Sequence, residues 1–164
     1  MGVFEIALIL STLLCSLVAG FLFAFVFVVM PGIGTLNDRE FIRAFQKIDG
    51  IIQSNQPVFI LVWVGSVLVL AASTLLGLWE LTGAWRAILI IATLVYLLGV
   101  QLPTVTINIP LNNKLQALDV EAMDEAAQNT ARRGFEPRWN RWNSIRTGLA
   151  GLVSALLMVL LFRL

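Results

Sequence analysis

The sequence predicts an all-α membrane protein, a single domain of residues 1–164 in which four transmembrane helices form an up-and-down bundle. Hydrophobic residues make up 59% of the chain and charged residues 13%, whereas charged residues are about a quarter of a typical soluble domain. The charges occur in blocks, and the charge-free runs between them are residues 6–37, 50–79, 87–113 and 147–162. The first three runs exceed the roughly 20 helical residues that cross a bilayer core. The fourth is flanked by Arg146 and Arg163, whose long side chains can reach the interface.

These runs place the four helices at about residues 3–30, 57–79, 86–113 and 137–162. The first helix ends at Pro31-Gly-Ile-Gly34, because proline and glycine interrupt helices. Pro57 and Pro137 suit the first turns of the second and fourth helices, where a missing N–H group is tolerated. Residues 80–86 are short enough to be a tight turn, so the second and third helices are predicted to be antiparallel neighbours.

Each of the two longer connectors is predicted to contain a short amphipathic helix. Between residues 37 and 53, apolar residues recur at helical spacing while charged residues occupy the other face. This helix either closes the bundle end and contacts lipid headgroups, or its polar residues line a cavity. The cavity-lining residues would then be Asp49, Gln53, Asn55 and Gln56. The second connector helix is expected between Leu118 and Gly134, with Asp119 as its cap.

The Lys and Arg residues are distributed unequally between the two ends of the predicted bundle. The first and third connectors and their flanks hold Arg39, Arg43, Lys47, Lys114, Arg132, Arg133, Arg138, Arg141 and Arg146. The other end holds Arg86 and Arg163. Because basic residues stay on the cytoplasmic side of a membrane, both long connectors are expected in the cytoplasm and both termini outside. We expect the protein in the inner (cytoplasmic) membrane of a bacterium.

Polar side chains form one stripe on each of the two helices that border the third connector. The third-helix stripe consists of Gln101, Thr104, Asn108 and Asn112, and the fourth-helix stripe consists of Trp139, Asn143 and Arg146. Pro103 and Pro110 loosen the backbone hydrogen bonding beside the first stripe. Polar groups are costly against lipid, so both stripes are predicted to face the bundle interior.

Where the two stripes meet, they would form a pocket with an aromatic floor, several amides and one cation. In a simpler interpretation the tryptophan anchors the interface, the arginine reaches the headgroups and the amides link helices. We favour the pocket because polar groups of both helices converge at one depth. The candidate catalytic residues are Arg146, Asn143, Asn112 and Asn108. The candidate ligand-binding residues are Trp139, Gln101, Thr104 and Asp49.

Missing residue types narrow the chemistry of such a site. The chain has no His and one cysteine, Cys15, which excludes an intramolecular disulfide and the usual haem, zinc and copper sites. The sequence shows no Gly-rich phosphate loop and no intramembrane carboxylate for proton transport. We therefore expect no cofactor, no metal ion and no nucleic-acid partner. The expected partners are membrane lipids and a hydrophobic aromatic or lipid-like ligand, and the oligomeric state is left open.

Four sequence features resemble those of the anthrone-oxygenase-like family of small four-helix membrane proteins. They are Pro31, the segment from Phe41 to Pro57, the motif Ile109-Pro-Leu-Asn-Asn-Lys-Leu115, and the pattern Trp139-x3-Asn143-x2-Arg146. The resemblance spans essentially the whole chain and implies oxygenation of anthrones to anthraquinones without metal or flavin.

The resemblance also implies a role for each part of the site. Arg146 with Asn108, Asn112 or Asn143 would stabilise the phenolate or enolate of the substrate, and Trp139 would stack on its rings. With no His in the chain, the general base would be Asp49 or a water molecule. The alternative is a non-catalytic membrane protein that binds a lipid or quinone-like ligand or serves as an accessory subunit.

Overall fold

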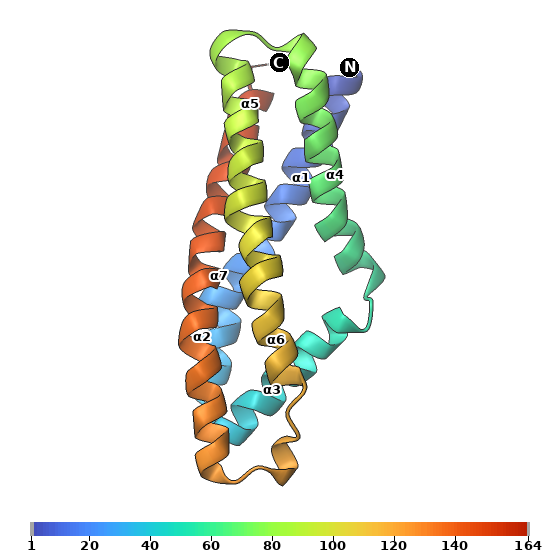
Figure 1. Ribbon diagram of the computed structural model, residues 1–164. Helices are drawn as coiled ribbons and strands as arrows, with labels where there is room; N and C mark the ends of the chain where they lie inside the picture. Colours follow the sequence, from blue (N-terminus) through green and yellow to red (C-terminus); the bar gives the residue numbers. More distant parts are fainter. Residues whose placement is uncertain (1, 164) are drawn as a thin grey trace.

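The computed structural model describes residues 2–163 and contains four long helices arranged up and down (Figure 1). All four are long and apolar enough to cross a membrane, and they cover Val3–Gly34, Pro57–Glu80, Gly83–Gln116 and Glu125–Leu161. Both termini and the short turn at residues 81–82 lie at one end of the bundle, here called the terminal end (Figure 1). The two long connectors, residues 35–56 and 117–124, form the other end, here called the connector end. The predicted all-α, four-helix fold is confirmed.

Two of the long helices are continuous but change their hydrogen-bonding pattern along their length. The first long helix consists of α1 (Val3–Ala24), the π-helical turn η1 (Phe25–Val29) and α2 (Met30–Gly34). The third long helix consists of α5 (Gly83–Val95), the π-helical turns η2 (Tyr96–Gln101) and η3 (Thr104–Asn108), and α6 (Ile109–Gln116). The second and fourth long helices are α4 (Pro57–Glu80) and α7 (Glu125–Leu161). The predicted bounds of the first three long helices agree with these to within about one helical turn.

Each π-helical turn ends two residues before a proline. The prolines are Pro31, Pro103 and Pro110. The residues just before them donate their N–H groups five residues back, Met30 to Phe25, Leu102 to Leu97 and Ile109 to Thr104. A proline ring clashes with the carbonyl four residues before it, and a wider π-helical turn moves that carbonyl away. The prolines therefore widen these helices and do not break them.

Of the two predicted connector helices, the structure contains the first as a separate element. It is α3 (Asp38–Gln53), and the Asn37 side chain caps it by accepting a hydrogen bond from the Glu40 N–H at 2.9 Å. The apolar face of α3 is buried, with Phe41, Ile42 and Phe45 packed toward α7. Because that face is covered by protein, α3 closes the connector end of the bundle.

The second predicted connector helix and the predicted start of the fourth helix at Pro137 are corrected by the structure. Residues 120–122 form a 3₁₀ turn, η4 (Val120–Ala122). Helix α7 begins at Glu125, is capped by Asp124, and runs through Pro137 without interruption. Pro137 lies on the exposed side of the helix, where the hydrogen bond that it removes costs least. The buried residues on either side of it, Phe135 and Trp139, belong to one packed cluster, and this packing favours a continuous helix.

Arg132 joins the end of the first long helix to α3 and α7. Its guanidinium group donates to the backbone carbonyls of Gly34 and Leu36, each at 2.8 Å. It also pairs with Asp38 at 3.1 Å and with Glu136 at 2.7 Å. Carbonyls at a helix C-terminus have no partner within the helix, so one side chain satisfies them and fixes the start of α3. This contact holds α3 in place over the connector end.

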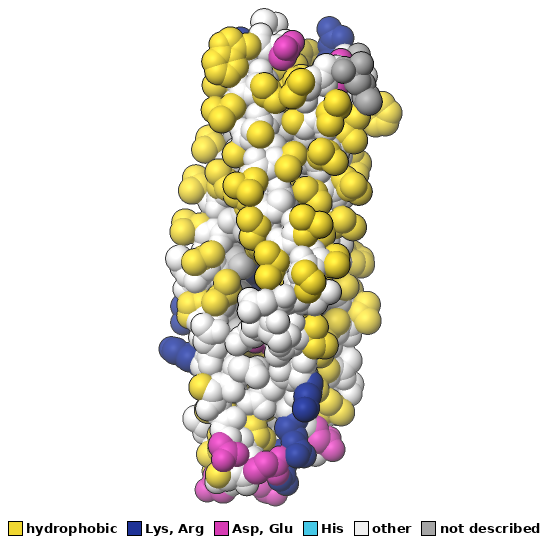
Figure 2. Space-filling view, turned by 90° about the vertical axis from the view of Figure 1, so that its right-hand side faces the viewer, with side chains coloured by type: hydrophobic (Ala, Val, Ile, Leu, Met, Phe, Trp, Pro, Cys, Tyr) yellow, Lys and Arg dark blue, Asp and Glu magenta, His cyan; other side chains and the backbone are white. Residues whose placement is uncertain are grey.

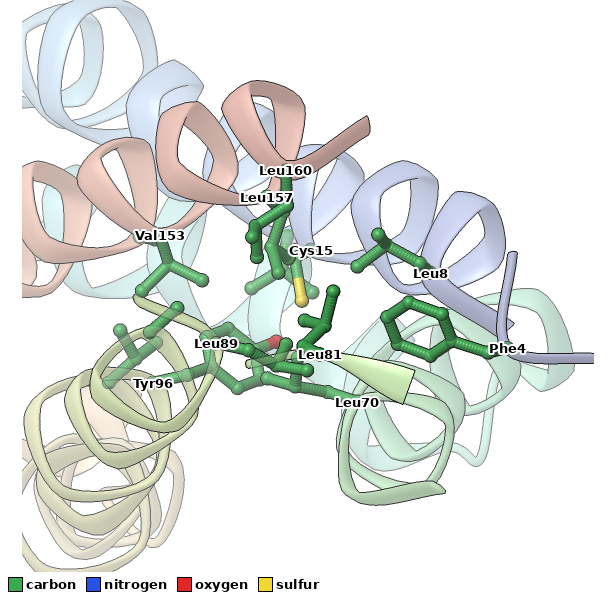
Figure 3. Close-up of a cluster of buried hydrophobic side chains, with 14 of the residues drawn as sticks. Phe4, Leu8, Cys15, Leu70, Leu81, Leu89, Tyr96, Val153, Leu157 and Leu160 are labelled. Atoms are coloured by element: carbon green, nitrogen blue, oxygen red, sulfur yellow. The ribbon is translucent and has the colours of Figure 1, made fainter. Parts of the chain in front are cut away.

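The bundle interior is divided into two clusters. The cluster of the terminal half is mainly aliphatic, with Leu8, Leu70, Leu89 and Leu157 pointing toward one another (Figure 3). Paired hydroxyl groups link the helices within this half, as between Ser66 and Tyr96 at 2.6 Å. The cluster of the connector half is rich in aromatic side chains: Phe25, Phe41, Phe45, Phe135 and Trp139. Polar residues concentrate beside this second cluster.

Candidate functional site

A cavity of about 230 Å³ lies in the connector half of the bundle. All four long helices and α3 contribute to its walls, with the side chains of Phe21, Leu22, Phe25, Phe45, Asp49, Ile52, Gln53, Phe59, Trp63, Thr104, Asn108, Ile109, Asn112, Asn113, Trp139, Asn143 and Arg146. Most of this lining is apolar, and its two charged members among the described residues are Asp49 and Arg146. Ligand sites in proteins commonly combine an apolar wall with a few polar groups, and this cavity has that character.

Seven of the eight site residues proposed from the sequence line this one cavity. They are Arg146, Asn143, Asn112, Asn108, Trp139, Thr104 and Asp49. Gln101 lies outside the lining and instead accepts a hydrogen bond from the Trp63 indole N–H at 2.9 Å. Straight α-helical spacing placed Gln101 in the stripe, but it is the last residue of η2. The wider turn changes its direction relative to Thr104 and Asn108.

Arg146 lies at the end of the cavity away from α3, with 3% of its surface exposed. Its Nη1 donates to the Thr104 hydroxyl at 2.7 Å and its Nη2 to the Asn143 side-chain oxygen at 2.9 Å. The Thr104 hydroxyl donates its own proton to the Val100 carbonyl at 2.7 Å, which leaves a lone pair for Arg146. Among residues 2–163, no carboxylate is within ion-pair distance of this guanidinium group.

Two polar atoms in the cavity lining are buried and have no hydrogen-bond partner in the described part of the chain. They are Nε of Arg146, which is a donor, and Oδ1 of Asn108, which is an acceptor. Unpartnered polar atoms are uncommon in protein interiors and are costly. A buried cation without a counter-ion is more costly still. The Arg146 end of the cavity therefore carries a positive charge that no carboxylate of residues 2–163 neutralises.

Asp49 lies at the α3 side of the cavity and is held by side-chain amides. Its carboxylate accepts hydrogen bonds from Gln53 at 2.6 Å and from Asn112 at 2.8 Å. The Asn112 oxygen accepts in turn from the Trp139 indole N–H at 2.7 Å. Burial raises the pKa of Asp49 above 3.8, and the hydrogen bonds from Gln53 and Asn112 partly oppose that shift. A carboxylate with a raised pKa is a better proton acceptor than an exposed one.

The aromatic walls of the cavity were not predicted. Phe21, Phe25, Phe59 and Trp63 belong to helices whose sequences look like plain hydrocarbon, and Phe45 belongs to α3. Phe59 and Trp63 stack with ring centroids 5.3 Å apart, and Phe45 meets Trp139 edge to face at 5.6 Å. Aromatic residues four positions apart, as in Phe21 and Phe25 or Phe59 and Trp63, were the available signal. The cavity thus has flat aromatic faces between an end that holds Arg146 and an end that holds Asp49.

A model of the anthrone oxygenase family matches residues 50–157. This range includes the lining residues of α4, η3, α6 and α7. It begins just after Asp49, so that Asp49 and the first long helix lie outside it. Neither the curated proteins nor the solved structures contain a match. The matched range covers more than half of the chain and most of the cavity. The chain belongs to the anthrone oxygenase family.

Proposed function

We propose that the protein is a cofactor-independent oxygenase that acts on hydrophobic phenolic substrates of the anthrone type. The observation that carries the proposal is the buried Arg146, which lines an aromatic cavity and has no carboxylate partner among residues 2–163. A deprotonated anthrone is planar, hydrophobic and anionic at one oxygen. It therefore matches both the aromatic faces of the cavity and its unused cation.

The chemistry balances with O₂ as the oxidant. Asp49 accepts a proton from the ring methylene group, and Arg146 binds the resulting oxyanion. The electron-rich ring reduces O₂, and a C–O bond forms at the former methylene carbon to give a hydroperoxide. The O–O bond then breaks as the remaining hydrogen leaves that carbon, so that one anthrone and one O₂ yield one anthraquinone and one water. The protein supplies orientation, charge stabilisation and exclusion of bulk water.

One observation favours a second candidate, a protein that binds a quinone-like or lipid ligand without catalysis. The polar groups on the α3 side already satisfy one another, in the chain from Trp139 through Asn112 to Asp49 and Gln53. Such a closed network rigidifies a binding site, and a carboxylate that receives two hydrogen bonds is a weaker base than a free one.

Turnover of a simple anthrone distinguishes the two candidates. The purified protein is reconstituted in lipid vesicles with anthrone and isotopically labelled O₂, and product is analysed by mass spectrometry. We expect anthraquinone that carries one labelled oxygen, formed faster than in protein-free vesicles. Binding of anthrone with no acceleration would support the non-catalytic candidate. A protein that does not bind anthrone and does not accelerate its oxidation would contradict both candidates.

We further propose that the connector end is cytoplasmic and that both termini are outside, in a bacterial inner membrane. Nine of the eleven Lys and Arg residues lie in the connector half of the bundle, Arg146 among them in the cavity, in agreement with the positive-inside rule. Cys15 is buried and is the one cysteine of the chain, so labelling of introduced cysteines can be read against a clean background.

A Thr82→Cys variant tests this orientation. Thr82 is exposed in the turn between α4 and α5, so a membrane-impermeant maleimide is expected to label it in intact cells. The matched control is Ala122→Cys, exposed at the connector end, which should react after the cells are lysed. Labelling in the opposite order would reverse the proposed topology.

A further inference from the structure

The cavity has one weakly packed side, which lies between α4 and the third long helix. Helix α4 packs along α1, and it meets the third long helix chiefly through α5 near the terminal end. Toward the connector end, α4 diverges from η3 and α6 (Figure 1). The other neighbouring wall elements, such as α1 with α7 and η3 with α7, are packed together. An entrance to the cavity is therefore expected on the α4 side.

Exposure of the lining residues places the opening on this side. Three of the lining residues are exposed, namely Gln53, Ile109 and Asn113. Gln53 ends α3, just before α4, and the other two lie on α6. Phe59, on the facing side of α4, is half-buried. Buried lining residues such as Phe25, Asn143 and Arg146 belong to the first long helix and to α7, the wall across from the opening.

Two side-chain hydrogen bonds border this opening, one toward the terminal end and one toward the connector end. Toward the terminal end, the Trp63 indole N–H donates to Gln101 at 2.9 Å and so connects α4 with η2. Toward the connector end, the Gln53 amide donates to Asn113 at 3.3 Å and connects α3 with α6. Between these two contacts lie Phe59 and Ile109, both apolar. Gln101, which does not line the cavity, thus has a place at its entrance.

The surface around the opening is hydrophobic on the side away from the connectors. Ile60, Leu61, Val64, Leu102 and Val105 expose apolar side chains on the two helices. Figure 2, which views the α4 side, shows hydrophobic side chains along most of the length of this face and most of the charged side chains toward the connector end. On the side away from the connectors, these exposed apolar side chains favour contact of the opening with lipid.

We infer that the gap framed by Trp63–Gln101 and Gln53–Asn113 is a lateral portal through which a hydrophobic ligand passes from the bilayer into the cavity. The inference rests on the proposed function, because it concerns the ligand of the same cavity. A flat, apolar molecule dissolved in the bilayer reaches Phe59 and Ile109 without crossing the polar connector end. Its polar edge then meets Arg146, and the Gln53–Asn113 contact limits the entry of water from the connector side.

The environment of the portal is measured without any ligand. A spin label is attached to Ile109→Cys or to Asn113→Cys in a Cys15→Ser background, with the protein in vesicles. At position 109 the label should collide more with O₂, which partitions into lipid, than with a water-soluble nickel chelate. At position 113, which lies closer to the connector end, collisions with the chelate should increase relative to collisions with O₂. Preferential contact of the chelate with position 109 would overturn the portal and leave the proposed reaction untouched.

Passage through the portal is measured with a bulky substitution and a matched control. Ile109→Trp fills the opening, whereas Ile91→Trp makes the same change at an exposed position of α5, outside the cavity lining. The probe is anthraquinone supplied in the vesicles, and its association is followed by quenching of tryptophan fluorescence. We expect Ile109→Trp to slow association about tenfold, because the larger side chain obstructs the entrance. Ile91→Trp should match the native rate.

An unchanged association rate in Ile109→Trp would overturn the portal. The outcome is independent of catalysis: slowed association in a protein that forms no anthraquinone would leave the portal standing and refute the proposed oxygenation.

Discussion

Replacing Arg146 with leucine is expected to abolish turnover without lowering the melting temperature. Arg146 is 3% exposed, and its guanidinium group has no carboxylate partner among the described residues. Removing a single oxyanion-binding donor typically costs about 10²–10³ in rate, and Arg146 supplies the one positive charge of the cavity lining. The loss of activity should therefore be at least about 10²-fold.

The melting temperature of the Arg146→Leu variant is expected to stay the same or to rise, although its activity falls. The leucine variant loses the hydrogen bonds to Thr104 and Asn143, and each unsatisfied partner costs about 1–3 kcal/mol. The native protein, however, has to keep an unpaired charge away from water. This desolvation costs several kcal/mol per ion even after relaxation of the protein, and the leucine variant avoids it. The Thr104 hydroxyl keeps its bond to Val100, so the desolvation effect should win and the melting temperature should rise or hold.

Thermal unfolding followed by tryptophan fluorescence, beside the anthrone assay, checks both expectations. Arg146→Lys serves as the control, because it keeps the charge and loses the planar fork of donors, and it should retain part of the activity. A leucine variant that unfolds more easily while each folded molecule still turns over normally would show that Arg146 is a structural residue.

Replacing Asp49 with asparagine is expected to lower turnover by about 10²–10⁴, the usual contribution of a general base. The amide is close in shape to the carboxylate, so the packing of α3 should be kept. The native enzyme should become more active as pH rises, because the base form is the carboxylate. The midpoint should lie above 3.8, since burial raises the pKa of Asp49. The asparagine variant should lose this rising limb of the pH profile.

The same pKa shift predicts how stability depends on pH. Between the unfolded value near 3.8 and the raised folded value, the folded protein holds a proton that the unfolded chain has released. Stability contributed by Asp49 is therefore complete below that window and is lost as pH rises through it. Asp49→Asn should remove this step from melting temperatures measured against pH. Asp119→Asn, at an exposed connector position, should leave both profiles as in the native protein.

The fold could be predicted because membrane helices have a strong one-dimensional signal. Charge-free runs of sufficient length fix the number of helices, and a tight turn or a long connector fixes which are neighbours. The start of α7 could not be predicted in this way, since Pro137 and Gly134 are both signals for a helix boundary. Burial of Phe135 and Trp139 on one face outweighed these signals, and burial depends on tertiary contacts.

The candidate site was partly predictable for a related reason. Polar groups within apolar helices must face the interior, so Thr104, Asn108, Asn143 and Arg146 could be brought together from their spacing alone. Aromatic residues such as Phe21 and Phe59 are compatible with either lipid or a cavity, and spacing does not distinguish the two. Gln101 was misplaced because the prediction assumed uniform α-helical geometry through η2.

The π-helical turns before Pro103 and Pro110 make the site depend on residue count as well as residue type. Each turn inserts a residue into the helical repeat, so the helix beyond it is rotated relative to the helix before it. Deleting Val105, Thr106 or Ile107 would swing Ile109 and Asn112 around the helix axis while leaving every lining side chain present in the sequence. In relatives of this chain, substitutions at these turns should therefore be better tolerated than changes of length.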